Sequence, residues 1–290
     1  MKKLFLYLFI LCSLFTVSIE AASFHAILVG DSLNDHDPTG FEGGVDLWKR
    51  EIKRIAAFTG LELKGFIFEE HHCRINEVIS HIKEMEVESD DVIFIYFAIH
   101  GSRSENKKNR WPDLVFSLDR DKIDFSFINH LLKEKKPRLL LSIADSCNNI
   151  VRGNAGKDRH KLVDLIEGQT AEEIPTVSNT DSFRELAIHH ATEELLEKYR
   201  SLFLEQSGTL LISTSSPGQF SIKHCLTGGI FTGQLIENLR KIQRNKTTSW
   251  ESLLIEASRA TRQKVEQIRK EMKLDAGQVP QFEINLSPSR

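Results

Sequence analysis

The chain has 290 residues, of which 40% are hydrophobic and 27% are charged. That length and composition suit one α/β domain with a sizeable core, or at most two small domains. The formal net charge of −3 argues against bulk binding of nucleic acid, and no run of like charges is long enough for a disordered tail.

The first 22 residues have the pattern of a secretory signal peptide. Two lysines precede an apolar run, 4–19, and two alanines stand just after it. An uncleaved anchor is the alternative, but the run is shorter than the roughly 20 residues that a membrane span needs. We therefore expect 1–22 to be removed, leaving a domain of residues 23–290 that is exported, periplasmic or secreted, and has no membrane contact.

Three cysteines remain after that removal: Cys73, Cys147 and Cys225. An odd number leaves at least one thiol unpaired, and an exported protein needs a reason to keep such a thiol. Catalysis is one reason and burial is the other. Burial suits Cys73 and Cys225.

Apolar runs typical of buried strands alternate with segments of helical spacing in the first half of the chain. We expect strands at 24–30, 61–68, 92–99 and 139–144, and helices at 43–58, 75–85 and 125–132. A strand at 209–214, helices at 229–239 and 249–272, and an edge strand at 278–284 follow later. This alternation predicts the α/β class, with a mostly parallel, doubly wound sheet flanked by helices.

Residues 148–206 interrupt that pattern. The segment is polar and contains Gly153, Gly156, Gly168 and Pro175, and only its second half has the spacing of a helix. A long and mostly irregular stretch inside a compact domain is usually a functional or mobile insertion. We therefore expect a long insertion here.

Polar residues follow three of the expected strands at the point where each strand ends. They are Gly30-Asp31, His100-Gly101 and Asp145-Ser146-Cys147. Because the carboxyl ends of parallel strands meet at one edge of a sheet, these residues should converge. A cysteine or a histidine alone at such a place is more often structural, but together they suit a nucleophile and its base. The backbone N–H groups of Gly101 and Cys147 could then hold an oxyanion.

Two of these segments resemble motifs of the caspase and metacaspase clan. Residues 96–102 resemble its strand followed by His-Gly, and Asp145-Ser146-Cys147 is similar to the Asp-Ser-Cys nucleophile motif of metacaspases. The order of His before Cys also fits. Further segments agree in order, at 43–46, 215–219, 228–232 and 278–281, so the likeness spans roughly 24–282 apart from the insertion.

The resemblance implies a caspase-hemoglobinase fold and an endopeptidase that hydrolyses peptide bonds through a thioester. Cys147 would be the nucleophile and His100 the general acid and base. The N–H groups of Gly101 and Cys147 would form the oxyanion hole. The partner would be a peptide or protein substrate.

The resemblance also implies cleavage after Arg or Lys. Asp46 and Asp145 match acidic positions of the primary pocket in metacaspase-like enzymes, and Ser215 falls in the late substrate-binding loop. Two carboxylates would suit a cationic side chain. The alternative for Asp46 is a helix N-terminal residue favoured by the helix dipole.

The sequence also departs from the family pattern. Asn148-Asn149-Ile150 follows the cysteine where metacaspases usually have His-Ser-Gly, and Ile99 precedes His100 where Gly is usual. An inactive caspase-like module that binds a partner peptide is therefore the main alternative. A different thiol hydrolase on a doubly wound sheet is a third, but it would not explain the later matching segments.

Activation in this clan often involves a cut between the nucleophile half of the chain and the half that follows. The expected insertion contains four basic residues, Arg152, Lys157, Arg159 and Lys161. For a protease that cuts after basic residues, these predict a self-cleavage segment.

Some metacaspases require calcium, and three aspartates lie close together at Asp119, Asp121 and Asp124. Such carboxylates can bind a hard cation, although clusters of this kind are more often simply solvated. The run His71-His72-Cys73 lacks the ligand spacing of a structural zinc site. We therefore expect no metal and no cofactor, with calcium as the one possibility.

Overall fold

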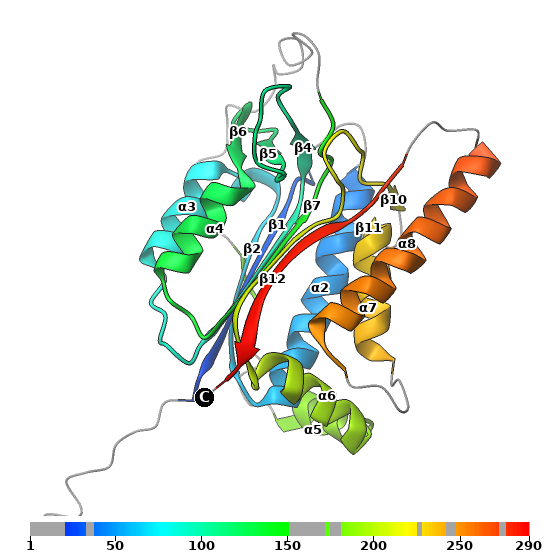
Figure 1. The fold of residues 1–290 in the computed structure, drawn as a ribbon. Coiled ribbons are helices and arrows are strands. Elements are labelled where there is room, and N and C mark those ends of the chain that lie inside the picture. Colours follow the sequence, from blue (N-terminus) through cyan, green and yellow to red (C-terminus); the bar gives the residue numbers. More distant parts are fainter. Residues whose placement is uncertain are drawn as a thin grey trace, which may run out of the picture.

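The computed structural model describes residues 21–32, 38–150, 172–174, 181–224, 228–241, 248–272 and 277–289. A seven-stranded sheet in the order β12-β9-β7-β3-β1-β2-β8 forms its centre (Figure 1). Its strands are β1 (Ser23–Gly30), β2 (Glu62–Phe68), β3 (Val92–Ala98), β7 (Leu139–Asp145), β8 (Glu172–Ile174), β9 (Gln206–Ser213) and β12 (Gln281–Pro288). The five inner strands are parallel and the two edge strands are antiparallel. The predicted α/β class with a mostly parallel sheet is confirmed.

Helices cover both faces of the sheet (Figure 1). On one face lie α2 (Pro38–Thr59), α5 (Asp181–His189), α6 (Glu193–Phe203), α7 (Ile230–Arg240) and α8 (Trp250–Met272), and on the other α3 (Ile75–Glu84) and α4 (Phe125–Glu134). Each face has its own apolar core. Along β3, Phe94 and Tyr96 enter the first core, while Ile95 and Phe97 enter the second. This explains the unbroken apolar run of that strand, because both of its faces are covered.

Two small antiparallel sheets were not predicted from the sequence. One consists of β4 (His100–Ser102), β5 (Asp113–Phe116) and β6 (Asp121–Asp124), and the other of β10 (Lys223–His224) and β11 (Gly228–Gly229). A short helical turn, Glu70–His72, was also not predicted. These strands are two to four residues long, too short for an alternating pattern to be distinguished from a loop. The first sheet continues directly from the carboxyl end of β3, so it lies where the functional residues were expected.

The expected insertion at 148–206 needs a correction. The helix predicted in its second half exists as α6, but Leu196, Tyr199, Leu202 and Phe203 of this helix are buried in the first core. Within the same stretch, β8 pairs with β2 and extends the sheet. The apolar side chains of α6 recur at helical spacing and need a partner surface, so this part is integral to the domain. The basic residues of the expected self-cleavage segment, Arg152, Lys157, Arg159 and Lys161, lie outside the described residues.

Residues 1–20, most of the expected signal peptide, also lie outside the described residues, so removal of 1–22 stays a prediction. Across the described ranges, no helix has both the length and the apolar composition of a membrane span.

Acid should destabilise this fold through the buried His25 and the half-buried His81. Burial lowers the pKa of His81 on α3 to about 4, and burial also lowers the pKa of His25 on β1. The His81 ring packs against Phe66 with centroids 4.1 Å apart. In the unfolded chain His81 takes up a proton near pH 6.5, but in the folded protein only near pH 4. The folded state therefore has its full stability with respect to His81 above pH 6.5, and it loses stability as the pH falls toward 4.

We expect His81→Leu to flatten this acid dependence by about 1–2 kcal/mol, after allowance for solvent screening. The measurement is the free energy of unfolding by denaturant at pH 4.5 and at pH 7. His130→Gln is the matched control, since the His130 side chain is 68% exposed. An identical slope in wild type and His81→Leu would contradict the assignment.

Candidate active site

The pairing of β3 with β7 places His100 and Cys147 at the same edge of the sheet. Ala98 of β3 is in register with Asp145 of β7. His100 lies two residues after Ala98, and Cys147 lies two residues after Asp145. A Cβ atom added to Gly101 would lie 2.0 Å from the carbonyl oxygen of Cys147. The strand that begins with His100 therefore lies directly against the backbone of the cysteine, and only glycine permits this approach. The predicted convergence of strand ends is present in the structure.

His100 is half-buried and begins β4, where it is in register with Val115 of β5. Its ring packs edge-on against Phe41 of α2, with ring centroids 5.0 Å apart and planes at 75°. An edge-to-face contact of this kind restricts the orientation of the imidazole. The histidine is thus held by a strand on one side and an aromatic ring on the other.

Cys147 is also partly buried, and the N–H of Ser221 donates a hydrogen bond to its Sγ at 3.4 Å. Burial raises the pKa of the Cys147 thiol, and this outweighs the lowering by the Ser221 hydrogen bond and by the charge of Lys223. The thiol is therefore protonated at neutral pH and needs a base to become a nucleophile.

Cys73 is different, because it is 1% exposed and burial raises its pKa well above the ordinary value. The expectation that Cys73 is a buried thiol is confirmed. Cys225 lies outside the described residues.

Asp145 is fully buried two residues before the cysteine. Its carboxylate accepts hydrogen bonds from four hydroxyl groups, those of Tyr96 (3.0 Å), Thr214 (3.1 Å), Ser221 (2.8 Å) and Thr232 (2.6 Å). A Cβ atom on Gly229 would lie 2.0 Å from its Oδ2, so the backbone of β11 covers the carboxylate closely. All four partners are neutral, which leaves the negative charge of Asp145 close to Cys147. Its role in substrate binding stays a prediction.

Asp46 does not join Asp145 in this structure. It is exposed on α2, whereas Gly44 is buried, and a Cβ atom there would lie 2.4 Å from the Tyr96 hydroxyl that binds Asp145. Two residues correspond to about 200° around a helix, so Asp46 points away from the Asp145 carboxylate. Asp46 is also not a helix N-terminal residue favoured by the helix dipole, because α2 begins at Pro38 and Asp46 lies beyond its first turn. The expected pair of pocket carboxylates is not formed here.

Ser215 also requires a correction. It was expected to contact substrate, but it is fully buried, and its hydroxyl donates to the carbonyl oxygen of Ser146 at 2.8 Å. Its own carbonyl oxygen accepts from the side chains of Asn148 and Gln281. Ser215 therefore holds the backbone on either side of the cysteine in place, and its side chain is not available to a substrate.

Three residues around the thiol were not identified from the sequence as part of the site. Ser221 contacts both Cys147 and Asp145. Gln278 donates to the carbonyl oxygen of Thr214 at 2.9 Å and accepts from the N–H of Ile222 at 2.9 Å, which fixes the segment that carries Ser221. The only sequence signal was that both residues lie in or near segments that matched the family.

Lys223 is the third, and the Nζ atom of its side chain lies 3.0 Å from the ring centroid of Phe41. Its charge lowers the pKa of Cys147 and also that of Asp31, the buried carboxylate at the end of β1 whose pKa is raised by burial. A cation therefore lies within electrostatic reach of Cys147 and of Asp31, which both follow strand ends.

The three aspartates considered for calcium have other partners. Asp119 accepts from the N–H of Ile75 at 2.6 Å, Asp124 caps α4 by accepting from the N–H of Ser126, and Asp121 accepts from the N–H of Lys122 at 2.8 Å. In the described part of the chain, no three acidic, histidine or cysteine side chains group as metal ligands. The carboxylates stabilise two helix starts and the beginning of β6, and calcium binding stays a prediction.

Loss of the Lys223 charge should slow the reaction of the thiol. Lys223→Met removes a cation that favours the thiolate, so the pKa of Cys147 should rise further. We expect alkylation of Cys147 by iodoacetamide at pH 8 to become roughly two- to fivefold slower, with the pH profile displaced to higher pH. Lys83→Met, an exposed lysine on α3, serves as the control. An unchanged profile would exclude a role for Lys223 in thiol ionisation.

A mostly parallel sheet with a cysteine and a histidine at adjacent strand ends is an α/β architecture that suits a cysteine peptidase. A family model described as the caspase domain matches residues 58–288. The chain therefore belongs to the caspase domain family, and the resemblance noted in the sequence is confirmed.

One solved structure supports the fold, and a second is similar over most of its length. Caspase-1 from Spodoptera frugiperda superposes with a TM-score of 0.52 and 16% sequence identity, over 90% of this chain and 88% of that one. A Geobacter sulfurreducens protein of solved structure is also 16% identical, covers 92% of this chain and 94% of that one, and has a TM-score of 0.46. No curated protein sequence matches the chain.

Proposed function

We propose that this protein is an exported cysteine endopeptidase with Cys147 as nucleophile and His100 as general acid and base. The observation that carries the proposal is the contact between Gly101 and the Cys147 backbone, because it brings the histidine strand and the cysteine loop together. The pairing of Ala98 with Asp145 supports the same arrangement. Export is supported by the pattern of residues 1–22, and sequencing the N-terminus of the secreted or periplasmic protein tests it.

In the proposed reaction, the Cys147 sulfur attacks the carbonyl carbon of the scissile peptide and His100 takes the thiol proton. The N–H groups of Gly101 and Cys147 stabilise the oxyanion that forms. When the carbon–nitrogen bond breaks, His100 gives its proton to the leaving amine and a thioester remains. Water, deprotonated by His100, then attacks the thioester, and the thiol is regenerated as the acid product leaves.

Cleavage after Arg or Lys is the proposed specificity. It is supported by the buried negative charge of Asp145, whose hydrogen-bond partners are all neutral hydroxyls. Lys223 argues in the other direction, since a cation near the thiol would favour an acidic substrate side chain. The preference for a basic or an acidic substrate side chain therefore depends on whether that side chain lies nearer to Asp145 or to Lys223.

A caspase-like module that binds peptides without cleaving them is the second candidate. It is favoured by Asn148-Asn149-Ile150, which stands where metacaspases usually have His-Ser-Gly, and by the raised pKa of Cys147. The residues around Cys147 and His100 would then bind a partner peptide.

The test is hydrolysis of fluorogenic peptides that end in Arg, Lys, Asp or Asn by the mature protein and by Cys147→Ala, with and without calcium. Cleavage after Arg or Lys that the variant lacks would support the proposal in full. Cleavage after Asp would keep the catalytic pair and reject the basic specificity. A folded wild-type protein that cleaves none of the peptides would favour the inactive module.

A further inference from the structure

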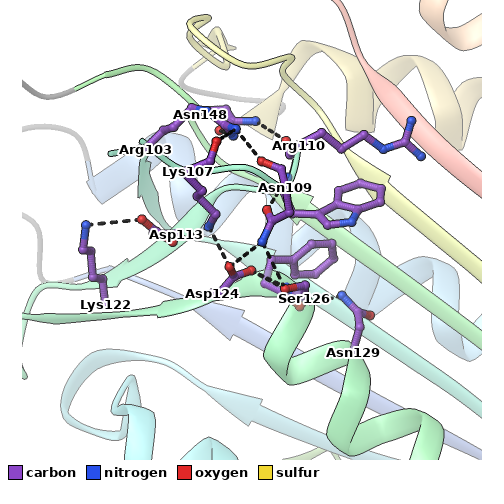
Figure 2. Close-up of polar contacts among 12 residues, drawn as sticks. Arg103, Lys107, Asn109, Arg110, Asp113, Lys122, Asp124, Ser126, Asn129 and Asn148 are labelled. Atoms are coloured by element: carbon purple, nitrogen blue, oxygen red, sulfur yellow. Dashed lines mark hydrogen bonds and ion pairs between the residues drawn. The ribbon is translucent and has the colours of Figure 1, made fainter. Parts of the chain in front are cut away.

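Arg103 is a buried arginine at the base of the loop that follows the histidine strand. It is 8% exposed, and its guanidinium points into the loop it begins (Figure 2). Its Nη2 atom donates to the carbonyl oxygens of Lys107, at 2.9 Å, and Asn109. Its Nη1 atom donates to Oδ1 of Asn148 at 3.3 Å. One side chain thus connects the loop after β4 with the residue next to the nucleophile.

Asn148 completes the connection from the other side. It is fully buried, and its Nδ2 atom donates to the carbonyl oxygens of Arg110 at 2.9 Å and Ser215 at 3.4 Å. Its N–H donates to the carbonyl oxygen of Gln219 and its carbonyl oxygen accepts from the N–H of Gly218. Every polar group of this residue is therefore satisfied within the protein, by two separate loops.

The backbone repeats the connection. The N–H of Arg103 donates to the carbonyl oxygen of Asn149 at 2.9 Å, and Arg103 forms an isolated parallel bridge with Ile150. The residues after Cys147 thus run beside the residues after His100. The catalytic pair is framed by this contact on one side and by the Gly101 contact on the other.

An ionic cluster anchors the loop to the scaffold (Figure 2). Lys107, whose side chain is 7% exposed, pairs with Asp113 of β5 and with Asp124, at 3.0 Å from the latter. Asn109 donates to Asp124 at 2.7 Å, and Asp124 caps α4. The loop is therefore fixed to β5 and α4, so Arg103 has a rigid base from which to hold Asn148.

We propose that Arg103 and Asn148 are positioning residues that fix Cys147 relative to His100. The inference rests on the proposed peptidase function. Without the guanidinium, the buried Asn148 Oδ1 and two partly buried loop carbonyls would lose this donor, and the cysteine loop would shift to satisfy them. A displacement of about 1 Å at a reacting group can cost about 10²-fold in rate. Asn148 stands where metacaspases usually have His, and Arg103 would be its partner in this chain.

Arg103→Met tests the proposal, and Arg138→Met is its matched control. Arg138 is also an arginine that binds backbone carbonyls, those of Phe203 at 2.8 Å, Leu204 at 2.8 Å and Gln206 at 2.7 Å. It immediately precedes β7, whereas Cys147 follows the other end of that strand. The control therefore removes a comparable set of hydrogen bonds, but at the end of β7 that is far from Cys147.

We expect Arg103→Met to lower kcat by about 10- to 100-fold with KM within about twofold. The pH profile of Cys147 alkylation should move up by about half a pH unit or more, since the sulfur would lose its alignment with the Ser221 N–H. Arg138→Met should lower the melting temperature while leaving kcat and the alkylation profile of the folded protein unchanged. Arg103→Lys should recover part of the activity, because an ammonium has donors but lacks the planar fork of the guanidinium.

The proposal is overturned if folded Arg103→Met and Arg103→Lys keep the wild-type alkylation profile. If Arg103→Met does not fold, Arg103→Lys alone decides by the same criterion. Alkylation does not require peptide cleavage, so a wild-type protein that cleaves no peptide would reject the peptidase function while this measurement still decided the positioning. In a double-mutant cycle, Arg103→Met and Asn148→Ala together should shift the profile less than the sum of the two single shifts.

Discussion

Replacing His100 with alanine is expected to lower kcat by about 10²–10⁴-fold at neutral pH, the usual contribution of a general acid and base. Burial keeps the Cys147 thiol protonated at that pH, so removal of the imidazole removes the group that takes the proton. The loss should shrink as the pH approaches the raised pKa of the thiol, because hydroxide can then ionise the thiol without a base. The measurement is kcat against pH for the best peptide substrate.

His130→Ala is the matched control for this experiment. The His130 side chain is 68% exposed on α4 and pairs with Glu134 one turn away, so its loss should leave kcat unchanged. Equal activity of His100→Ala and wild type across the pH range would exclude the proposed acid and base. An equal loss at every pH would instead indicate that the histidine acts after thiol ionisation.

Asp145→Asn is expected to destabilise the fold by about 2–3 kcal/mol. The carboxylate accepts from four buried hydroxyls, and an amide offers only one oxygen and places two N–H donors against groups that also donate. Some hydroxyls can rotate and become acceptors, which keeps the loss below that of a broken buried ion pair. The measurement is denaturant unfolding at pH 7.

Asp121→Asn gives the comparison, since Asp121 is exposed in β6 and accepts a hydrogen bond from the N–H of its neighbour Lys122. Its stability should stay within about 0.5 kcal/mol of wild type. Wild-type stability of Asp145→Asn would show that the hydroxyl cluster does not depend on the charge. If Asp145 also selects a cationic substrate, kcat/KM should fall more for peptides ending in Arg or Lys than for the others.

The sequence alone predicted six of the seven strands of the central sheet, all but β8, because the inner strands are covered on both faces. Strands such as β3 and β7 read as unbroken apolar runs, and α2, α7 and α8 carry one apolar stripe each. Their order then placed His100 and Cys147 at the same edge, since parallel strands end together. The pattern within each segment was sufficient here, because the apolar run marks the buried strand and the residues that follow it lie at its carboxyl end.

Only the tertiary structure decided how the surrounding residues are used. Ser215 is buried, Asp46 points away from Asp145, and α6 belongs to the core, although each stands in a segment that suggested otherwise. The partners of Asp145 come from β3, the segment after β9, and α7, and no pattern in the sequence connects them. A hydrogen bond between distant segments depends on how loops and helices pack across the sheet, and that geometry is not contained in the periodicity of any single segment.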